Sequence, residues 1–184
     1  MLSECGVVRV ALTRRLAVPG EDMHPHSSGN AVSALAPRPL RAATFDDLAE
    51  VTRLVGVLGY PCDVETMAPR LRVWLSQEHC GLFVATMPEA PDTLAGLVAA
   101  EYRVILEHEP RVEVMAMVVD APARRMGLGR QLIDHAAGWA ATRGVNMLFL
   151  RSNIVRPEAH GFYESLGFTR AKTQHVYERA VPGV

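Results

Sequence analysis

The chain has few cysteines, few aromatic residues and no excess of charge of either sign. Of its 184 residues, three are cysteine and 6% are aromatic, and 19 lysines and arginines face 20 acidic residues for a net charge of -1 at pH 7. This balance excludes a strongly basic nucleic-acid binder and an acidic tail protein. Cys5, Cys62 and Cys80 are widely spaced and form no CxxC pair, which argues against a zinc site or a redox motif.

Long hydrophobic runs are also absent. No segment approaches the roughly 20 apolar residues that cross a bilayer. Arg9, Arg14 and Arg15 interrupt the apolar stretch near the N-terminus, unlike the core of a signal peptide. The sparse, unpaired cysteines are typical of a reducing compartment. We therefore expect a cytoplasmic protein that binds neither membrane nor nucleic acid and holds no metal.

Turn-forming residues dominate the first 37 positions, where no helix or strand pattern is visible. We expect residues 1–37 to be a flexible leader. His24 and His26 flank a proline with no third ligand nearby, so this pair does not indicate a metal site. Residues 38–184 are long enough to build one complete core, and we expect them to form one domain.

The hydrophobic period changes along residues 38–184. A short strand-like segment at 40–43 precedes two helical patterns, and alternation then predicts an antiparallel meander. Helices and strands alternate in the last third, which implies a parallel pair with a right-handed crossover. The predicted helices are 44–58, 64–77, 128–143 and 157–166, and the other predicted strands are 81–86, 94–106, 111–119, 146–152 and a last one from 168. The predicted fold is therefore α+β, a mixed sheet of about six or seven strands in the order β-α-α-β-β-β-α-β-α-β, with helices on both faces.

A basic loop with two glycines lies between the strand at 111–119 and the helix at 128. Gly127 and Gly129 allow a tight backbone path and leave unpaired N–H groups at a helix N-terminus, an arrangement that attracts phosphate. Arg124, Arg125 and Arg130 add positive charge that suits a diphosphate. The glycine spacing fits neither a Walker loop nor a dinucleotide-binding fingerprint. A tight turn beside a solvated basic helix start is the alternative.

This loop resembles a known signature. Residues 124–129, Arg-Arg-Met-Gly-Leu-Gly, are similar to the Arg/Gln-x-x-Gly-x-Gly/Ala motif of the GNAT superfamily of acetyl-CoA-dependent N-acetyltransferases, and like that motif they follow a strand and open a helix. A second landmark is similar too: Asn153 precedes a helix that ends in Phe-Tyr-x-x-x-Gly-Phe at 162–168. The resemblance covers residues 40–177, and it implies the GNAT fold and acetyl-CoA as the acetyl donor.

The resemblance also implies which residues bind the cofactor. The pantetheine arm would lie as a pseudo-strand along residues 117–119, and the N–H of Met117 would face the thioester carbonyl as an oxyanion donor. Asn153 would bond the pantetheine, and Tyr163 would protonate the departing thiolate. The full implied set for the cofactor is Met117, Val118, Val119, Arg124, Arg125, Met126, Gly127, Leu128, Gly129, Arg130, Asn153, Ala159 and Tyr163.

Two residues are candidates for proton transfer. Tyr163 lies at helical spacing from Ala159 and Leu166, and a phenol with a pKa near ~10 matches the basicity of a leaving thiolate. Its alternative role is that of a core aromatic. Glu113 lies four residues before Met117 on the same predicted strand and is our candidate base for the amine, with an exposed edge carboxylate as the alternative.

The predicted activity is transfer of acetyl from acetyl-CoA to a primary amine of a small molecule or peptide, by direct attack in a ternary complex without metal. An acyl-CoA-binding sensor or interaction module without catalysis is the alternative. Residues 58–63 and 107–111 should wall the acceptor pocket, but they do not identify the amine. The resemblance is compatible with a homodimer and does not require one.

Overall fold

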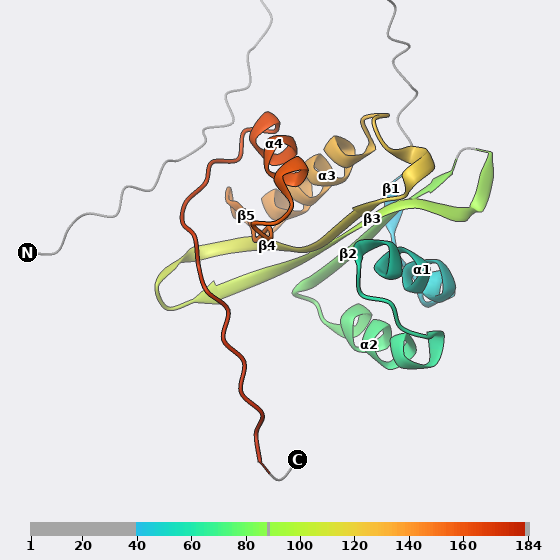
Figure 1. Ribbon diagram of the computed structural model, residues 1–184, viewed down its shortest axis with the longest axis horizontal. Coiled ribbons are helices and arrows are strands. Elements are labelled where there is room, and N and C mark those ends of the chain that lie inside the picture. Colours follow the sequence, from blue (N-terminus) through green and yellow to red (C-terminus); the bar gives the residue numbers. More distant parts are fainter. Residues whose placement is uncertain (1–39, 88, 183–184) are drawn as a thin grey trace, which may run out of the picture. The chain divides into compact units, whose positions relative to one another are not determined.

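The computed structural model describes residues 40–87 and 89–182 of the chain, so the expected leader at 1–37 lies outside the described residues. The chain divides into a larger unit that ends at Arg151 and a smaller unit that begins at Ser152. Figure 1 shows the elements of both units. The two units are described separately below.

The larger unit contains a mixed sheet of five strands in the order β1-β2-β3-β4-β5. Neighbouring strands are antiparallel from β1 to β4, and β4 and β5 are parallel. The strands are β1 Leu40–Ala42, β2 Cys80–Met87, β3 Ala90–Ile105, β4 His108–Val119 and β5 Leu148–Leu150. The meander and the parallel crossover pair therefore confirm the predicted mixed α+β fold.

The sheet has fewer strands than the six or seven expected. The strand predicted from Phe168 onward does not form, and residues 168–180 have no regular secondary structure. A strand needs a pairing partner and usually one buried face. Residues 169–182 are exposed throughout, so this segment has no buried face.

Helices cover both faces of this sheet. They are α1 Leu48–Leu58, α2 Val64–Ser76 and α3 Leu128–Thr142, with short 3-10 turns η1 Phe45–Asp47 and η2 Ala121–Ala123. The helices α1 and α2 lie on one face and α3 lies on the other (Figure 1). The helix predicted from residue 44 begins with the 3-10 turn η1, which continues into α1. Asp47 accepts a hydrogen bond from the Thr44 N–H at 2.8 Å and closes a capping box at this start.

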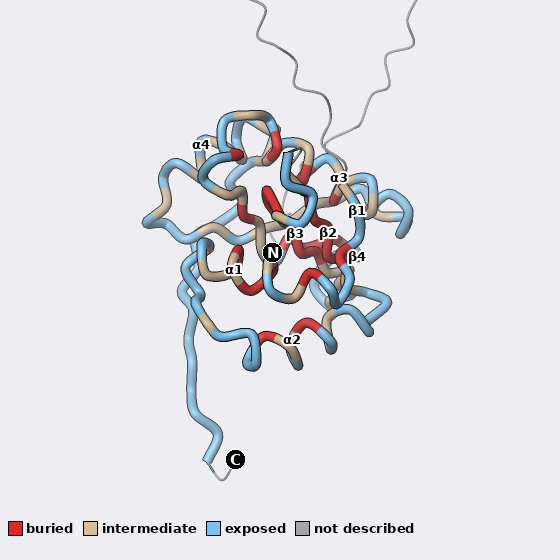
Figure 2. Tube along the Cα trace, turned by 90° about the vertical axis from the view of Figure 1, so that its right-hand side faces the viewer, coloured by how far each residue is buried: buried red, intermediate tan, exposed pale blue. Residues whose placement is uncertain are grey.

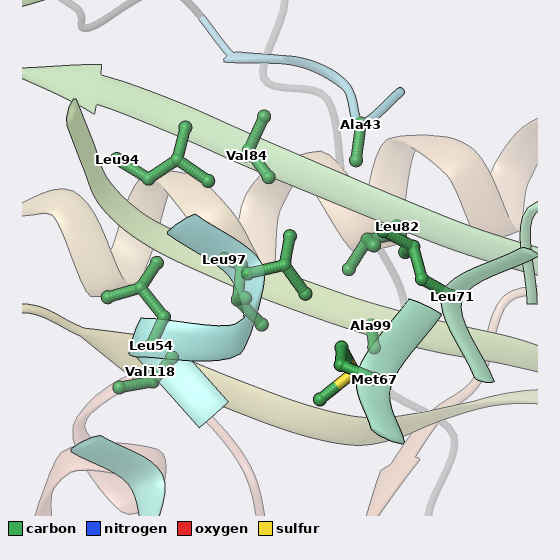
Figure 3. Close-up of a cluster of buried hydrophobic side chains, with 11 residues drawn as sticks. Ala43, Leu54, Met67, Leu71, Leu82, Val84, Leu94, Leu97, Ala99 and Val118 are labelled. Carbon is green, nitrogen blue, oxygen red and sulfur yellow. The ribbon is translucent and has the colours of Figure 1, made fainter. Parts of the chain in front are cut away.

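The main core lies between the sheet and the pair α1 and α2. Leu54 of α1 and Met67 and Leu71 of α2 pack against the apolar side chains of β2 to β4 (Figure 3). Buried residues are concentrated on these strands and on the helix stripes that face them (Figure 2). The other face packs against α3, where Ala140 contacts the cluster of Ala100 and Val112. Alternate residues of β3 and β4 therefore serve two different cores.

The smaller unit contains one helix, α4 Pro157–Ser165, among its described residues. Pro157 occupies the first turn, and Gly167 ends the helix with a left-handed φ of 89°. The ring of Tyr163 packs edge to face against Phe162, with centroids 5.2 Å apart, and against Phe168 at 5.7 Å. The aromatic landmark at 162–168 is thus the packing centre of this unit.

Candidate active site

A β-bulge at Met115 changes the course of β4. In the register of β3 and β4, Ala99 pairs with Ala116 and Ala100 pairs with Val114, so Met115 is an extra residue on β4. The pairing of β4 with β5 covers only Val112 to Val114. Beyond Val114, no strand in the described part of the chain pairs with β4 on that side. The two strands therefore part at the bulge.

The main chain of residues 117–119 borders this opening. The N–H of Asp120 donates to the carbonyl of Ala95 on β3 at 2.8 Å. Because main-chain groups alternate in direction along a strand, those of Met117 and Val119 point away from β3, toward the side where β5 has ended. A polar, extended chain placed in the opening could therefore form a strand-like ladder with these groups.

The loop after β4 bends sharply before α3. Arg125 has a φ of 59° and Gly127 a φ of 77°, and both values lie in the left-handed region. Gly127 is the N-cap of α3 and has no side chain to cap the helix. The first-turn N–H groups of Leu128 and Gly129 have no acceptor within the helix, and the N-terminal end of a helix is partially positive. This cradle of main-chain donors is typical of anion-binding sites.

Asp120 anchors the start of the loop. One carboxylate oxygen accepts from the N–H of Ala121 at 2.8 Å, and the other accepts from Arg53 of α1 at 2.6 Å. Arg53 also binds Glu50 through two bonds of 2.9 Å and donates to the carbonyl of Leu94 at 2.9 Å. These partners raise the pKa of Arg53, and the hydrogen bonds from Arg53 lower the pKa of Glu50. No sequence pattern predicts this network, because Arg53 and Asp120 are 67 residues apart.

The side chain of Arg124 folds back onto the end of β4. Its Nε donates to the carbonyl of Val119 at 3.1 Å. This carbonyl is one of the groups that border the opening, and a carbonyl oxygen has two lone pairs. Val119 can therefore accept from Arg124 and still accept from a bound chain.

Glu113 lies in the interior and not at an exposed edge. Only 1% of its surface is exposed. Its Oε2 accepts from Arg103 of β3 at 2.9 Å, and its Oε1 accepts from Arg151, which follows β5. Each carboxylate oxygen thus has one guanidinium donor and one further lone pair. Both arginines were missed as site residues, because nothing in the local sequence marks them.

The smaller unit holds the remaining residues of the predicted site. Burial raises the pKa of Tyr163 above its ordinary value, with a smaller opposing effect from Arg156. Asn153 is exposed, and its Oδ1 accepts from the N–H of Val155 at 3.2 Å. Ala159 is half-buried in α4. A phenol with its ordinary pKa of about 10 is already protonated at neutral pH, and burial shifts the pKa of Tyr163 further in that direction.

The predicted site residues thus belong to two different units of the chain. The larger unit holds Glu113, Met117, Val118, Val119, Arg124, Arg125, Met126, Gly127, Leu128, Gly129 and Arg130. The smaller unit holds Asn153, Ala159 and Tyr163. Among the described helices, none is both long and apolar enough to cross a membrane.

Comparison with known proteins identifies the family. A model of the acetyltransferase (GNAT) family matches residues 47–168. The chain belongs to the GNAT family. It is an acyltransferase that uses acetyl-CoA as the acetyl donor, as the sequence predicts.

Relatives and solved structures agree with this assignment. The uncharacterized N-acetyltransferase YhdJ of Bacillus subtilis (strain 168) is 30% identical over 125 residues, which are 67% of this chain and 86% of that protein. The [ribosomal protein bS18]-alanine N-acetyltransferase of Salmonella typhimurium is 37% identical over 67 residues, only 36% of this chain and 45% of that protein. The structure of AAC(6')-Iy with the bisubstrate analog CoA-S-monomethyl-acetylneamine has a TM-score of 0.70 at 17% identity, and the match covers 79% of this chain and 100% of that one.

Proposed function

We propose that this protein transfers acetyl from acetyl-CoA to a primary amine of a small molecule or peptide, by direct attack of the amine in a ternary complex. The observation that carries the proposal is the parting of β4 and β5 at the Met115 bulge, directly upstream of the left-handed loop at the start of α3. Together they present main-chain donors at two places, along the strand at Met117 and Val119 and at the left-handed loop with the first turn of α3. Two such places suit a long ligand with amide groups at one end and a diphosphate at the other.

The main chain of the larger unit supplies the binding groups in this proposal. Acetyl-CoA, when bound, supplies an activated acetyl thioester. Met117 and Val119 would hold the arm, and the N–H of Met117 would donate to the thioester carbonyl oxygen, where negative charge develops during attack. The left-handed loop and the first turn of α3 hold the diphosphate. Fixed main-chain dipoles of this kind need no rearrangement as the charge develops.

Tyr163 is the proposed general acid. A leaving thiolate needs a proton, and a phenol whose pKa is raised by burial is protonated across the neutral range. The edge-to-face contacts with Phe162 and Phe168 restrict the rotation of the ring. The side chain therefore supplies a proton from a defined position.

Glu113 is the proposed base. An amine must lose its proton before or during attack, and Glu113 would take that proton through a water molecule. Arg103 and Arg151 hold the carboxylate in one orientation and leave each oxygen one lone pair. The residue lies next to Val114, where the pairing with β5 ends. This position places the carboxylate beside the opening.

Thiol release tests the proposal directly. The full chain is first titrated with acetyl-CoA by calorimetry, and free thiol is then measured with acetyl-CoA and a panel of amino acids, polyamines, aminoglycosides and peptides. We expect acetyl-CoA to bind, and at least one amine to give one thiol per acetylated product. Binding without release across the panel would instead favour an acyl-CoA-binding module, and the absence of binding would refute both functions.

A further inference from the structure

Charged residues gather on the face of the sheet opposite α3. Leu97 and Ala99 of β3 pack into the core under α1 and α2, and alternation places Glu101 and Arg103 on this same face. The register pairs Arg103 with Arg111 and Glu113 with Phe149, and paired residues project to the same side. Arg151, two residues after Phe149, binds Glu113. We call Arg103, Arg111 and Arg151 the arginine cluster.

The carboxylates on this face do not balance the arginine cluster. Arg103 and Arg151 share Glu113, and Arg103 also lies 4.0 Å from Glu101. Arg111 forms no ion pair within the described residues, and its guanidinium carbon lies 3.8 Å from the centroid of the Phe149 ring. The Nε of Arg111 is buried without a hydrogen-bond partner in the described part of the chain. One guanidinium charge therefore has no carboxylate to compensate it.

Within the arginine cluster, Arg151 directly follows β5 at the opening, and the guanidinium of Arg111 lies over Phe149 in the paired segment just before it. Glu113 pairs with Phe149, and only one further pair, Val114 with Leu150, follows before β5 ends. The bulge at Met115 lies two residues after Glu113. The helix α3, with its diphosphate cradle, lies on the opposite face. An amine that attacks a thioester held in the opening would approach from the face that carries the cluster. This step rests on the function proposed above.

We propose that the acceptor carries a carboxylate in addition to its amine, and that Arg111 and Arg151 bind this carboxylate. A guanidinium presents parallel N–H donors that match a carboxylate, and it retains its charge when partly desolvated. The side chain of Arg151 is 59% exposed, and among its donors Nη2 contacts Glu113. Arg111 is held in place by its stacking on Phe149. The cluster thus selects amino acids or peptides with a free carboxylate over purely cationic amines.

Matched acceptor pairs test this specificity. Each free L-amino acid is compared with its carboxamide, and short peptides are compared with their C-terminal amides, by thiol release with the full chain. We expect kcat/KM to be about tenfold higher for the acids, since a hydrogen-bonded charge pair is lost in the amides. Amidation of a free amino acid lowers the pKa of its amine and raises the neutral fraction at pH 7, which opposes the expected preference for the acid, and in the peptides the amine is remote from the amidated end. If only the free amino acids, or only the peptides, are preferred over their amides, that result identifies which class of acceptor the enzyme uses.

Variants assign the preference to the cluster. Arg151→Met should lower the ratio of kcat/KM for the acid to kcat/KM for the amide about tenfold, and any effect on Glu113 that the two acceptors share cancels in this ratio; Arg151→Lys should recover part of the loss. Arg111→Lys gives a second test if Arg151→Met does not fold, and melting temperatures report folding. Arg70→Met, at an exposed position of α2, is the matched control and should retain the preference.

Four results would contradict the proposal. Equal kcat/KM for acids and amides refutes it, and so does a preference that survives both Arg151→Met and Arg111→Lys. Acetylation of cationic amines alone also refutes the carboxylate subsite but leaves the proposed acetyltransferase function intact. Acetyl-CoA binding without release for any acceptor refutes both.

Discussion

Two regions of the larger unit present different kinds of chemical group. At the open edge of β4 and the start of α3, the proposed binding groups belong to the main chain: the strand beyond Met115, two left-handed residues and the first turn of a helix. On the α1 and α2 face of the sheet, the charges belong to side chains, with Glu113 between two guanidinium groups. The main-chain groups depend on backbone conformation, whereas the side-chain charges depend on one another. Mutations should therefore act differently in the two regions.

The largest effect should come from a side chain that takes part in the chemistry and leaves the main-chain groups untouched. Tyr163→Phe should lower kcat by about 100-fold or more and change the Kd of acetyl-CoA little, because the main chain binds the donor. Steady-state kinetics and calorimetry measure the two quantities. Tyr177→Phe, at an exposed tyrosine, is the matched control. If the affinity for acetyl-CoA falls as much as kcat does, Tyr163 also binds the donor, and the main chain alone does not account for donor binding.

Glu113→Ala should destabilise the protein most among the charged residues. It removes the buried carboxylate that Arg103 and Arg151 share, and because both arginines remain partly exposed we expect a cost of roughly 2 kcal/mol in the free energy of unfolding. Urea denaturation measures this cost. Glu164→Ala is the control, since its ion pair with Arg170 is exposed and should contribute less than about 1 kcal/mol. A similar loss of unfolding free energy in both variants would show that the buried ion pairs of Glu113 contribute no more to stability than an exposed ion pair does.

Gly127→Ala should act on donor binding. A Cβ at this position meets open space, so the cost is conformational, about 1 kcal/mol for a left-handed φ. We expect the Kd of acetyl-CoA to rise by roughly fivefold, because the bound loop must keep this conformation and each 1.4 kcal/mol changes a binding constant tenfold. Gly138→Ala in α3 also meets open space but lacks a positive φ, and its Kd should not change. Equal affinity in both variants would refute the role of the loop's backbone conformation.

Arg53→Ala should have the smallest effect, and that effect should depend on pH. The hydrogen bonds from Arg53 hold the pKa of Glu50 below its ordinary value of 4.5, so the pair stabilises the fold above that pH and loses this contribution as the pH falls through the lowered pKa. At pH 7 we expect a loss of about 1 kcal/mol or less, because Arg53 is partly exposed. Denaturation from pH 7 to pH 3 should show the difference between wild type and variant shrinking. A difference that grows on acidification would contradict this account.

Local patterns in the sequence predicted most of the fold. The four helices lie within a few residues of their predicted bounds, because the 3.6 period, the Thr44 to Asp47 box and the glycines at 59 and 167 act over one or two turns. The prediction failed for the strand from Phe168. The strand was expected from the alternation of helices and strands in the last third, but strand formation also needs a pairing partner, which a local pattern cannot supply.

The candidate site was predictable only where it is contiguous. Residues 124–130 form one short run, so their glycines and arginines are enough to mark a loop at a helix start. Glu113 was selected for its place on the strand, but its partners Arg103 and Arg151 lie 10 and 38 residues away along the chain. No spacing rule connects residues at such distances.

The sequence alone determined the positions of the helices, the antiparallel meander and the left-handed loop, because each depends on residues that are neighbours in the chain. Tertiary structure decided where β4 parts from β5, which guanidinium groups share Glu113, and that Arg111 has Phe149 beneath it and, among the described residues, no carboxylate. These pairings follow from strand register. A shift of one residue would turn every side chain of a strand to the other face, so only the assembled sheet determines which charges meet.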